Sequence, residues 1–330
     1  MTIRIIIIKL GALGDVVRTL PVLPALKEKY PDSDIFWITK PNAKDLFEGN
    51  PYVKEVYTIP YEINNKEKFD LLYNFDIENE ATDLAEKITA DKKYGFYSQD
   101  GFPTVFNFQS EYYLNTIFDD DLKKSNKKTY QQMIFECAEL TWKKQHCKIF
   151  LSKKDIEYAN EFVNKNKINT SRLIGIHLGA SPRWPSKVWH EDNLKEFIRK
   201  AINEKFNILL FAGKSEEKSL IKIKEDLSKE QIKVFTNDPN NTIKQFSSLV
   251  NICKKMICSD SFSLHISLAL KKPTIGLFFC TSHSEIEDYG LLTKIISPQL
   301  KDFFPERMDE YNEELVKSIS AEEVLKEIRK

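Results

Sequence analysis

The stretch IRIIIIKLGALGDVVRTLP (residues 3–21) combines an apolar run, a loop with two glycines and an amphipathic segment. A continuous run of isoleucines is typical of a parallel strand that is covered on both faces. Gly11 and Gly14 follow the run, and glycine permits the tight turns and close backbone approach that such a loop needs. The stretch therefore predicts a strand, a glycine loop and a helix, which is the opening unit of a doubly wound α/β fold.

The same alternation of apolar runs and amphipathic segments continues along the chain. Segments 21–30 and 191–205 are charged and have the spacing of helices. Repeated strand–helix alternation predicts mostly parallel sheets joined by right-handed crossovers. The other runs expected to form strands fall in two series, which are 34–39, 53–59 and 69–75, and then 172–179, 206–213, 232–236, 254–260 and 273–279.

The two series of strands predict two domains. A chain of 330 residues exceeds the roughly 100–200 residues of a typical domain. A polar segment, 151–172, separates the series, and we place the boundary near residue 165. We therefore expect domains at 1–165 and 166–310, followed by one or two charged helices in 311–330. Ligands of doubly wound sheets bind at the C-terminal ends of strands, so two facing sheets predict a site in the cleft between them.

Composition narrows the class of protein. Lys and Arg number 49, as do Asp and Glu, and the zero net charge argues against a general nucleic-acid-binding protein. The five cysteines are odd in number and form no C-x-x-C pair, which favours thiols in a reducing cytosol over disulfides or a zinc knuckle. The N-terminal apolar run is too short for a signal peptide, and no segment approaches the roughly 20 apolar residues that span a bilayer. We therefore expect a cytoplasmic protein.

Asp15 is the first charged residue after the glycine loop. An aspartate at this place often caps a helix or occupies its first turn, where the helix dipole favours a carboxylate. The C-terminal end of a strand also holds a side chain rigidly enough for a general base. The local sequence leaves both roles open.

A second candidate segment, IHLGASPRWPSKVWHEDNLKEF (residues 176–197), begins as a strand that ends near Gly179. The following loop carries hydroxyl groups and fixed positive charges, which suit a phosphate. A solvated basic loop anchored by two tryptophans is the alternative. The polar side chains in the loop are Ser181, Arg183, Ser186 and Lys187.

A third candidate segment, MICSDSFSLHISLALKKPTIGLFF (residues 256–279), predicts a strand, a short turn and a helix. Asp260 or Ser261 can cap this helix, and its first N–H groups offer an anion site. His265 stands in the opening turns, where it either donates to a phosphate oxygen or is a buried core residue.

Two acidic patterns, DSD (32–34) and DDD (119–121), resemble metal-binding D-x-D sequences. The first leads into a strand instead of following one and the second lies in a hydrophilic run, so we expect solvated charges and no metal site. The basic run 121–130 has the composition of a solvated face, although an anionic acceptor or lipid headgroups would also suit it. Its lysines are Lys123, Lys124, Lys127 and Lys128.

The three candidate stretches together resemble glycosyltransferase family 9, the lipopolysaccharide heptosyltransferases. The family opens with a strand and LGD-hydrophobic-LP, where this chain reads KLGALGDVVRTLP. Its second domain opens with IHPGAS, here IHLGAS, and continues to a strand that ends in glycine and acids, here LLFAGKSEEKSL. Its SDTGLLHIAAAL corresponds to SDSFSLHISLAL, and KKYGFY (92–97) stands where the family has a strand. The matches agree in order and spacing over most of residues 1–290.

The resemblance implies a GT-B architecture of two Rossmann-like domains, with the acceptor on the first and the nucleotide-sugar donor on the second. It also implies that a helix in 311–330 crosses back to the first domain. Asp15 is similar in position to the family's catalytic base, and Gly11, Gly14 and Arg183 lie in the loops near the substrates. The positions that correspond to the donor site are Ser181, Lys187, Glu216, Glu217, Asp260, Ser261, Phe262 and His265.

The roles implied for these residues fit their chemistry. Lys187, helped by Ser181, resembles the lysine that meets the donor diphosphate, and Glu216 or Glu217 resembles the acid near the nucleoside ribose. A carboxylate that removes the hydroxyl proton during attack is worth about 10²–10⁴-fold in rate. Lys187 and the N–H groups of a helix can stabilise the departing diphosphate without a metal.

Two positions depart from the family's pattern. Phe262 and Phe279 stand where the family has glycines, in segments that the resemblance assigns to the donor pocket. Glycine lets a phosphate approach the backbone closely, so a bulky ring there predicts an altered donor or lost donor binding.

The activity implied by the resemblance is inverting transfer of heptose from ADP-heptose to Kdo or heptose of the lipopolysaccharide inner core, with no further cofactor. Such an acceptor is lipid-linked, which implies transient contact with the inner face of the cytoplasmic membrane. Two alternatives stay open. The donor or acceptor can differ, including a glycan or protein acceptor, or the chain can be a non-catalytic glycan-binding protein. The oligomeric state is also open.

Overall fold

The computed structural model describes residues 2–62 and 67–330, and the chain folds into two compact units. The first unit consists of Met1–Phe150 and Ser284–Glu287, and the second consists of Leu151–His283 and Asp288–Lys330.

The division between the units lies before helix α7 (Lys153–Asn166), whereas the sequence predicts a boundary near residue 165, at the end of this helix. The physical reason is packing. Helix α7 lies against α10 (Ile243–Ile252) and so becomes part of the second unit.

Within the described residues, the first unit holds a six-stranded sheet in the order β3-β2-β1-β4-β5-β6. Its strands run parallel except β6, which is antiparallel to β5. Strand β1 is central, and residues 5–8 are fully buried, as expected for a strand covered on both faces. The predicted strands are confirmed, while β6 was not anticipated. The strands are β1 (Ile3–Ile8), β2 (Ser33–Thr39), β3 (Glu55–Thr58), β4 (Phe69–Asn74), β5 (Ala90–Gln99) and β6 (Phe102–Val105).

The helices of the first unit pack on this sheet and on one another. Helix α3 contacts β4 and β5, and α6 contacts both α1 and α4. Helix α6 begins with a capping box in which the side chains of Thr129 and Gln132 satisfy each other's backbone N–H groups. The helices are α1 (Leu13–Thr19), α2 (Val22–Lys29), η1 (Pro41–Phe47), α3 (Asn79–Lys87), η2 (Phe108–Ser110), α4 (Glu111–Phe118), α5 (Asp120–Ser125) and α6 (Tyr130–Cys137).

The second unit, whose residues are all described, holds a parallel sheet in the order β12-β11-β10-β7-β8-β9. The strands predicted in the second half of the chain are confirmed, although β9 is only two residues long and β12 was not predicted. The strands are β7 (Leu173–His177), β8 (Asn207–Phe211), β9 (Phe235–Thr236), β10 (Lys255–Ser259), β11 (Thr274–Phe278) and β12 (Leu292–Ile296).

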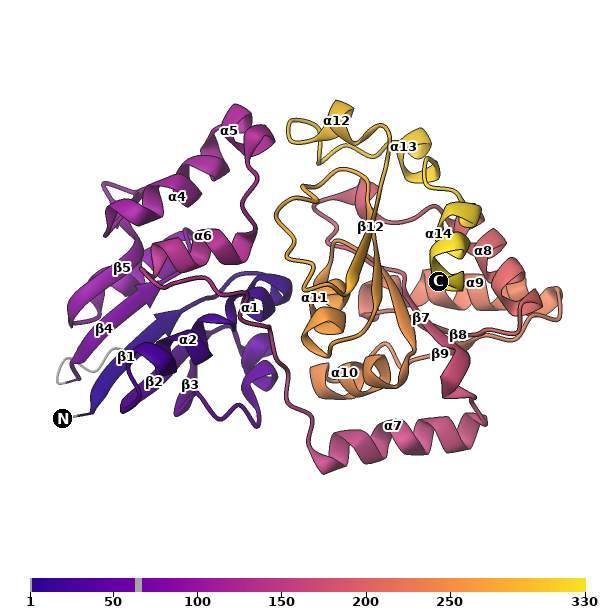
Figure 1. Cartoon of the computed structure of the whole chain (residues 1–330), viewed down its shortest axis with the longest axis horizontal. Coiled ribbons are helices and arrows are strands. Elements are labelled where there is room, and N and C mark those ends of the chain that lie inside the picture. The colour runs from indigo at the N-terminus through magenta and orange to yellow at the C-terminus, as the bar shows by residue number, and fades with distance from the viewer. Residues whose placement is uncertain (1, 63–66) are drawn as a thin grey trace. The chain divides into compact units, whose positions relative to one another are not determined.

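Helices cover both faces of the second sheet, with α8 and α9 on one side and α10 and α11 on the other (Figure 1). This arrangement confirms the doubly wound fold. No helix within residues 2–62 and 67–330 is long and apolar enough to cross a membrane. The remaining helices are η3 (Thr170–Arg172), η4 (Pro185–Lys187), α8 (Glu191–Asn203), η5 (Lys214–Glu216), α9 (Glu217–Lys229), α11 (Phe262–Ala269), α12 (Leu300–Phe303), α13 (Glu313–Lys317) and α14 (Ala321–Arg329).

The C-terminal helices belong to the second unit, which corrects the expectation that they cross back to the first. Helix α14 lies beside α8 (Figure 1), and Val324 and Ile328 join the hydrophobic core of this unit. The Asn193 side chain donates to the carbonyl oxygen of Ile319 at 2.8 Å. The segment 284–287 is instead grouped with the first unit, where Glu285 accepts a hydrogen bond from the backbone N–H of Tyr130 at 2.9 Å.

Candidate active site

Asp15 lies in the first turn of α1, just beyond the C-terminal end of β1. The N-cap of α1 is Ala12, so Asp15 takes the other of the two helix positions considered, the first turn, where the helix dipole favours its charge. The Arg18 Nε and Nη2 atoms donate to Asp15 Oδ1 at 3.0 and 2.8 Å. The Asp15 side chain is 34% exposed and Arg18 only 16%. One carboxylate oxygen is thus held by a fixed cation while the group stays accessible from solvent.

Asp76 follows β4, the neighbour of β1, and its side chain binds the backbone of the glycine loop. Its Oδ2 atom accepts the backbone N–H groups of Leu10 at 2.8 Å and Gly11 at 2.7 Å. Its Oδ1 atom lies 3.5 Å from the Nζ atom of Lys9, which also donates to the carbonyl oxygen of Phe75 at 2.9 Å. Both charged side chains are more than nine-tenths buried, so this ion pair is part of the interior.

Asn74, the last residue of β4, holds Asp76 in turn. The Asn74 side-chain nitrogen donates to the carbonyl oxygens of Asp76 at 3.0 Å and Phe96 at 2.8 Å. The Asp76 backbone N–H donates back to the Asn74 side-chain oxygen at 3.0 Å. These buried bonds fix the turn after β4 against β5, and therefore fix the glycine loop that Asp76 contacts.

Tyr130, the first residue of α6, packs its buried ring against Arg18. The guanidinium carbon lies 3.8 Å from the ring centroid, and the Tyr130 hydroxyl is 2.8 Å from Thr19 Oγ1. Lys9 Nζ lies 5.9 Å from the centroid of the same ring. We call Lys9, Asp15, Arg18, Asp76 and Tyr130 the Asp15 cluster.

The charges of the Asp15 cluster stabilise one another. Burial alone would lower the pKa of Lys9, but the carboxylates of Asp76 and Asp15 outweigh it and hold that pKa well above its usual value. Burial acts on Arg18 in the same direction, and Asp15 again outweighs it and raises the pKa. Both cations are therefore permanently charged, which keeps a fixed positive field around the Asp15 carboxylate.

In the second unit, Lys187 and Asp260 form a partly buried ion pair. The Lys187 Nζ atom donates to both the carbonyl oxygen and Oδ2 of Asp260 at 3.0 Å. His265 Nε2 lies 4.0 Å from Asp260 Oδ1, and His265 is 7% exposed. Burial raises the pKa of the Cys280 thiol to about 11, and the charges of Lys187 and Asp260 also act on it. The structure thus brings together residues from η4, the end of β10, α11 and the end of β11.

Helix α11 begins beside this pair. Ser261 is its N-cap, but the Ser261 hydroxyl contacts Ser263 Oγ at 2.9 Å instead of capping a backbone N–H. The side chain of Phe262, the first residue of α11, packs against Phe246 of α10 with 5.7 Å between ring centroids. Phe279 is different, because it is 1% exposed and belongs to the hydrophobic core. The interpretation of Phe279 as a donor-pocket residue is therefore corrected to a packing role.

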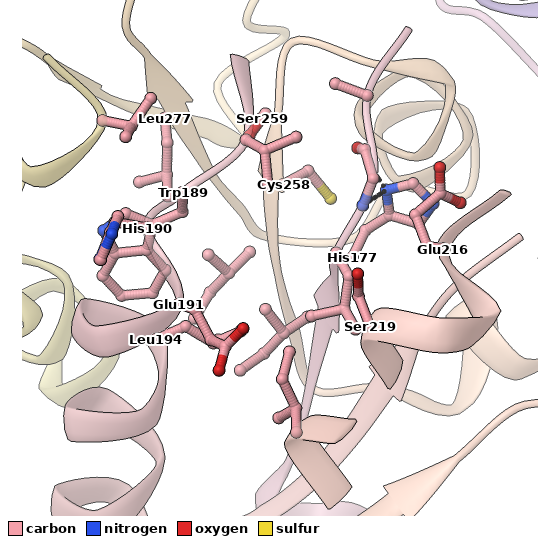
Figure 2. A pocket seen from close by; sticks show the side chains of 18 of the residues that line it. His177, Trp189, His190, Glu191, Leu194, Glu216, Ser219, Cys258, Ser259 and Leu277 are labelled. Atoms are coloured by element: carbon pink, nitrogen blue, oxygen red, sulfur yellow. Dashed lines mark hydrogen bonds between the residues drawn. The ribbon is translucent and has the colours of Figure 1, made fainter. Parts of the chain in front are cut away.

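A cavity of about 380 Å³ opens at the C-terminal ends of β7 and β10, within the second unit. Its volume is in the range of small-molecule sites. Residues next to the ion pair in sequence, Val188 and Ser259, line it. Figure 2 shows its two walls with the end of β10 between them, formed by Trp189, His190, Glu191 and Leu194 on one side and His177, Glu216 and Ser219 on the other.

Glu216 lies directly against Gly179 at this cavity. A Cβ atom built on Gly179 would lie 2.5 Å from Glu216 Cδ, which is too close for any real contact. The Gly213 N–H donates to Glu216 Oε2 at 3.0 Å and so anchors the carboxylate. Burial lowers the pKa of the neighbouring His177, against the opposing effect of Glu216. His177 Nδ1 lies 2.9 Å from the Gly179 carbonyl oxygen, a distance that fits donation from a neutral ring.

The other predicted residues lie further from these contacts. Ser181 and Arg183 occupy an exposed turn, where the Arg183 guanidinium stacks 4.7 Å from the Trp184 ring centroid. Glu217 begins α9 and does not line the cavity. Asp119, in the DDD pattern, caps α5 by accepting the N–H of Leu122 at 2.9 Å.

Asp15 belongs to the first unit and Lys187 to the second, and the expected cleft between the units stays a prediction. Within residues 2–62 and 67–330, no group of three or more His, Cys, Asp or Glu side chains is arranged to hold a metal ion. Metal independence also stays a prediction.

Sequence reasoning missed most of the Asp15 cluster. Asp76 had a usable signal, because it directly follows the predicted strand 69–75 and so had to lie at the C-terminal edge of the sheet, near Asp15. Tyr130 had none, since it comes from a helix far along the chain. His177 could have been found as the polar residue that ends a buried strand.

Known proteins of similar length resemble this chain in sequence and in fold. Lipopolysaccharide heptosyltransferase 1 of Campylobacter coli is 22% identical over 345 aligned positions, covering 99% of this chain and 98% of the relative. A glycosyl transferase family 9 structure from Veillonella parvula superposes with a TM-score of 0.76 at 18% identity, covering 98% of this chain and 95% of that one. The E. coli ADP-heptose lps heptosyltransferase II structure gives 0.72 at 16% identity, covering 99% and 98%.

The family model of glycosyltransferase family 9 (heptosyltransferase) matches residues 66–312. This range holds the whole of β4, the turn that carries Asp76, and the segment from β7 to β12. Because the match spans about three quarters of the sequence, the chain belongs to glycosyltransferase family 9 and is a glycosyltransferase.

Proposed function

We propose that this glycosyltransferase transfers heptose from ADP-heptose to a Kdo or heptose residue of the lipopolysaccharide inner core, inverting the anomeric carbon. One observation carries the proposal, which is that Asp15 stands at the end of β1 with an accessible carboxylate and one oxygen held by Arg18. The relatives support the choice of substrates, because their names specify ADP-heptose and lipopolysaccharide.

In the proposed reaction, a hydroxyl of the acceptor attacks the anomeric carbon of the donor. Asp15 accepts the hydroxyl proton as the new bond forms, a contribution of about 10²–10⁴-fold in rate. The transition state has oxocarbenium character, so charge develops on both the sugar and the departing diphosphate. Arg18 keeps the carboxylate oriented throughout, because its two donors fix Oδ1.

The donor is assigned to the second unit. Lys187 and the first N–H groups of α11 face the charge that develops on the diphosphate, and these groups can stabilise it without a metal. Asp260 holds Lys187 Nζ in place by two contacts at 3.0 Å. The nucleoside then takes the cavity, with Glu216 and His177 near the ribose.

The acceptor is lipid-linked, so the enzyme is proposed to be cytoplasmic and to visit the inner face of the cytoplasmic membrane. Lys124 and Lys127 are exposed around α5 and offer positive charge for such contact. Lys128 is less available, because it pairs with Glu136 at 2.7 Å and lies 4.0 Å from the Tyr112 ring centroid.

The proposal is tested by incubating the purified chain with ADP-heptose and a Kdo-bearing lipid A and detecting the added heptose by mass spectrometry. We expect product from the wild type and a loss of about 10²–10⁴-fold in kcat for Asp15→Ala. Asp91→Ala is the matched control, because Asp91 is an exposed carboxylate that pairs with Lys68 away from the Asp15 cluster.

Two outcomes would contradict the proposal. Unchanged turnover in Asp15→Ala would remove the assigned base. Preference for a GDP- or UDP-sugar, measured by thermal shift and by turnover, would replace the donor. Phe262 makes this second comparison necessary, because its ring begins α11 at a position where the family pattern that the sequence resembles has glycine.

A further inference from the structure

A tyrosine ring stands exposed at the rim of the cavity in the second unit. Tyr311 lines this cavity and is 61% exposed. Val188, which also lines it and is 38% exposed, directly follows Lys187 of η4. Other apolar residues of the lining, such as Trp189 and Leu194, are buried. Tyr311 and Val188 therefore form an apolar part of the rim that faces solvent.

A buried serine hydroxyl holds the backbone on both sides of Tyr311. Ser186 of η4 is fully buried, and its Oγ atom donates to the carbonyl oxygen of Glu310 at 2.8 Å. The same oxygen accepts the backbone N–H of Asn312 at 2.9 Å. Ser186 thus uses its one proton within the protein. The sequence places Ser186 in a loop that suits a phosphate, but the structure makes it a tie between η4 and the segment 310–312.

Further contacts hold the two residues that flank Tyr311. The Arg307 Nε and Nη2 atoms donate to Glu310 Oε2 at 2.9 and 2.7 Å. The Asn312 side chain caps α13 by accepting the N–H of Leu315 at 2.9 Å. A ring on a backbone that is already fixed costs little ordering entropy when a ligand covers it. Tyr311 is therefore preorganised to contact a ligand.

The position proposed for the ribose leaves the wall beside Tyr311 for the nucleobase. His177 and Glu216, which are assigned to the ribose, lie on one wall, and His190 belongs to the opposite wall (Figure 2). The segment after Tyr311 adjoins that opposite wall, because the His190 backbone N–H donates to the carbonyl oxygen of Val316 at 3.3 Å. A nucleoside that extends from one wall to the other brings its base next to Tyr311.

The exposed ring selects the chemistry of its partner. Trp189 also lines the cavity, but it is 6% exposed and its Nε1 atom donates to the carbonyl oxygen of Ile319 at 2.9 Å. The Tyr311 ring instead has an accessible face. Every nucleobase has a π-face, and stacking on an aromatic side chain raises affinity about 5- to 150-fold per base.

We propose that Tyr311 contacts the donor by stacking on its nucleobase, and that Ser186 is a positioning residue that holds Tyr311 in place. This inference rests on the proposed function, because it takes the nucleoside to occupy the cavity. Ser186 is next to Lys187, which is proposed to meet the diphosphate. The turn η4 then positions the cation for the phosphates and, through Ser186, the ring for the base.

The first test compares ADP with pyrophosphate, which has phosphates but no base. In Tyr311→Ala, we expect the dissociation constant for ADP, measured by calorimetry, to rise about 5- to 150-fold. The dissociation constant for pyrophosphate should be unchanged. Tyr311→Phe keeps the ring and should keep the wild-type affinity for ADP. Phe108→Ala is the control, because it removes a 76% exposed ring in the other unit.

Three results would overturn the proposal. Equal losses of ADP and pyrophosphate affinity in Tyr311→Ala would show that the ring supports the whole site and not the base. A loss in Tyr311→Phe as large as in Tyr311→Ala would show that the hydroxyl and not the ring makes the contact. Unchanged ADP affinity together with weaker binding of ADP-heptose would assign the ring to the sugar.

Failure of this inference is distinguishable from failure of the proposed function. If the wild type binds GDP or UDP more tightly than ADP, the proposed donor is wrong. The comparison is then made with that nucleotide, because stacking accepts every base. If heptose transfer is found and Tyr311→Ala keeps its ADP affinity, the function stands and the inference fails.

The second test is a double-substitution cycle on Ser186. Ser186→Ala removes the hydroxyl that holds the segment 310–312, and we expect the dissociation constant for ADP to rise several-fold. Combining it with Tyr311→Ala should cause no further rise beyond that of Tyr311→Ala alone, because Ser186 acts through the ring. If the two effects multiply instead, Ser186 acts independently of Tyr311 and its positioning role is wrong.

Discussion

The two candidate half-sites are built differently, although each lies at the C-terminal edge of a parallel sheet. In the first unit, four charged side chains and a tyrosine ring pack together, and each charge has a partner within the Asp15 cluster. In the second unit, one ion pair, Lys187–Asp260, lies beside a cavity of about 380 Å³ with mostly apolar walls.

The difference matches two physical tasks. A general base must be positioned to within a fraction of an ångström. Buried ion pairs restrain their side chains strongly, because moving one partner away would leave the other charge buried and uncompensated. A nucleotide-sized ligand instead needs room, apolar area and a few polar groups that set its orientation. Substitutions in the first unit should therefore change kcat, and those in the second should change nucleotide affinity.

The comparison between the two units assumes that a well-packed hydrophobic core supports the cavity wall. The substitution Phe279→Ala tests this assumption with the largest expected effect. Phe279 is 1% exposed, and removal of a buried phenylalanine ring costs about 3–5 kcal/mol. We expect that loss in the free energy of unfolding by urea titration. Phe262→Ala is the control, because this half-buried ring should cost only about 1–2 kcal/mol. Equal losses would show that the two rings are not packed as described.

Substitution of Arg18 tests the first unit, which contains the proposed base Asp15. In Arg18→Gln, Asp15 loses both donors on Oδ1, and we expect kcat to fall about a hundredfold, or about 2.7 kcal/mol. ADP affinity, measured by calorimetry, should hold because Arg18 belongs to the other unit. Arg18→Lys keeps the charge but not the planar fork and should recover part of the rate. A shift in ADP affinity with unchanged kcat would contradict the division of tasks.

The fold was predictable from the sequence because its strands are continuous apolar runs. Strand β11 is buried along its length, and β1 and β7 are each buried over four consecutive residues, so their apolar runs located them. Strands β6 and β12 were not predicted, since β6 is a short antiparallel edge and β12 is half-exposed with a lysine in its middle. Edge strands face solvent and lose the continuous apolar pattern.

The site was predictable only in part, because sequence patterns locate residues that follow strands but not contacts that depend on helix packing. Asp15, Lys187 and Asp260 each follow a strand or its adjoining loop, and sequence order together with the doubly wound topology places them at sheet edges. The ring of Tyr130 and the Thr19 hydroxyl that contacts it come from elements 111 residues apart. Such contacts depend on how helices pack, which no local pattern contains.

Lys187 provides the corresponding test in the unit that is proposed to bind the donor. In Lys187→Met, the proposed charge-assisted contact to the diphosphate would be lost, a change of about 1.5–2.5 kcal/mol. We expect the dissociation constant for ADP to rise about ten- to seventyfold, and the melting temperature of the free protein to fall as well because Asp260 loses this partner. Lys229→Met is the control, because Lys229 is 75% exposed and pairs with Asp226 on the surface of α9. Unchanged ADP affinity would remove Lys187 from the donor site.

The smallest effect concerns the protonation of His177, at the cavity wall. Burial lowers its pKa in the folded chain, whereas an unfolded histidine titrates near about 6.5. Between these two values the unfolded state binds a proton that the folded state does not, so stability must rise with pH in this range. It is therefore fully present above about pH 6.5 and declines as the solution is acidified below that value.

We expect the second unit to lose up to about 1 kcal/mol of stability between pH 7.5 and 5.5, measured by urea unfolding at each pH. The variant His177→Gln lacks the titrating ring and should lose less stability over the same interval. An exposed histidine has no lowered pKa and would give the variant and the wild type the same pH dependence. That result would mean that the His177 ring is solvated and that its side of the cavity is more open than described.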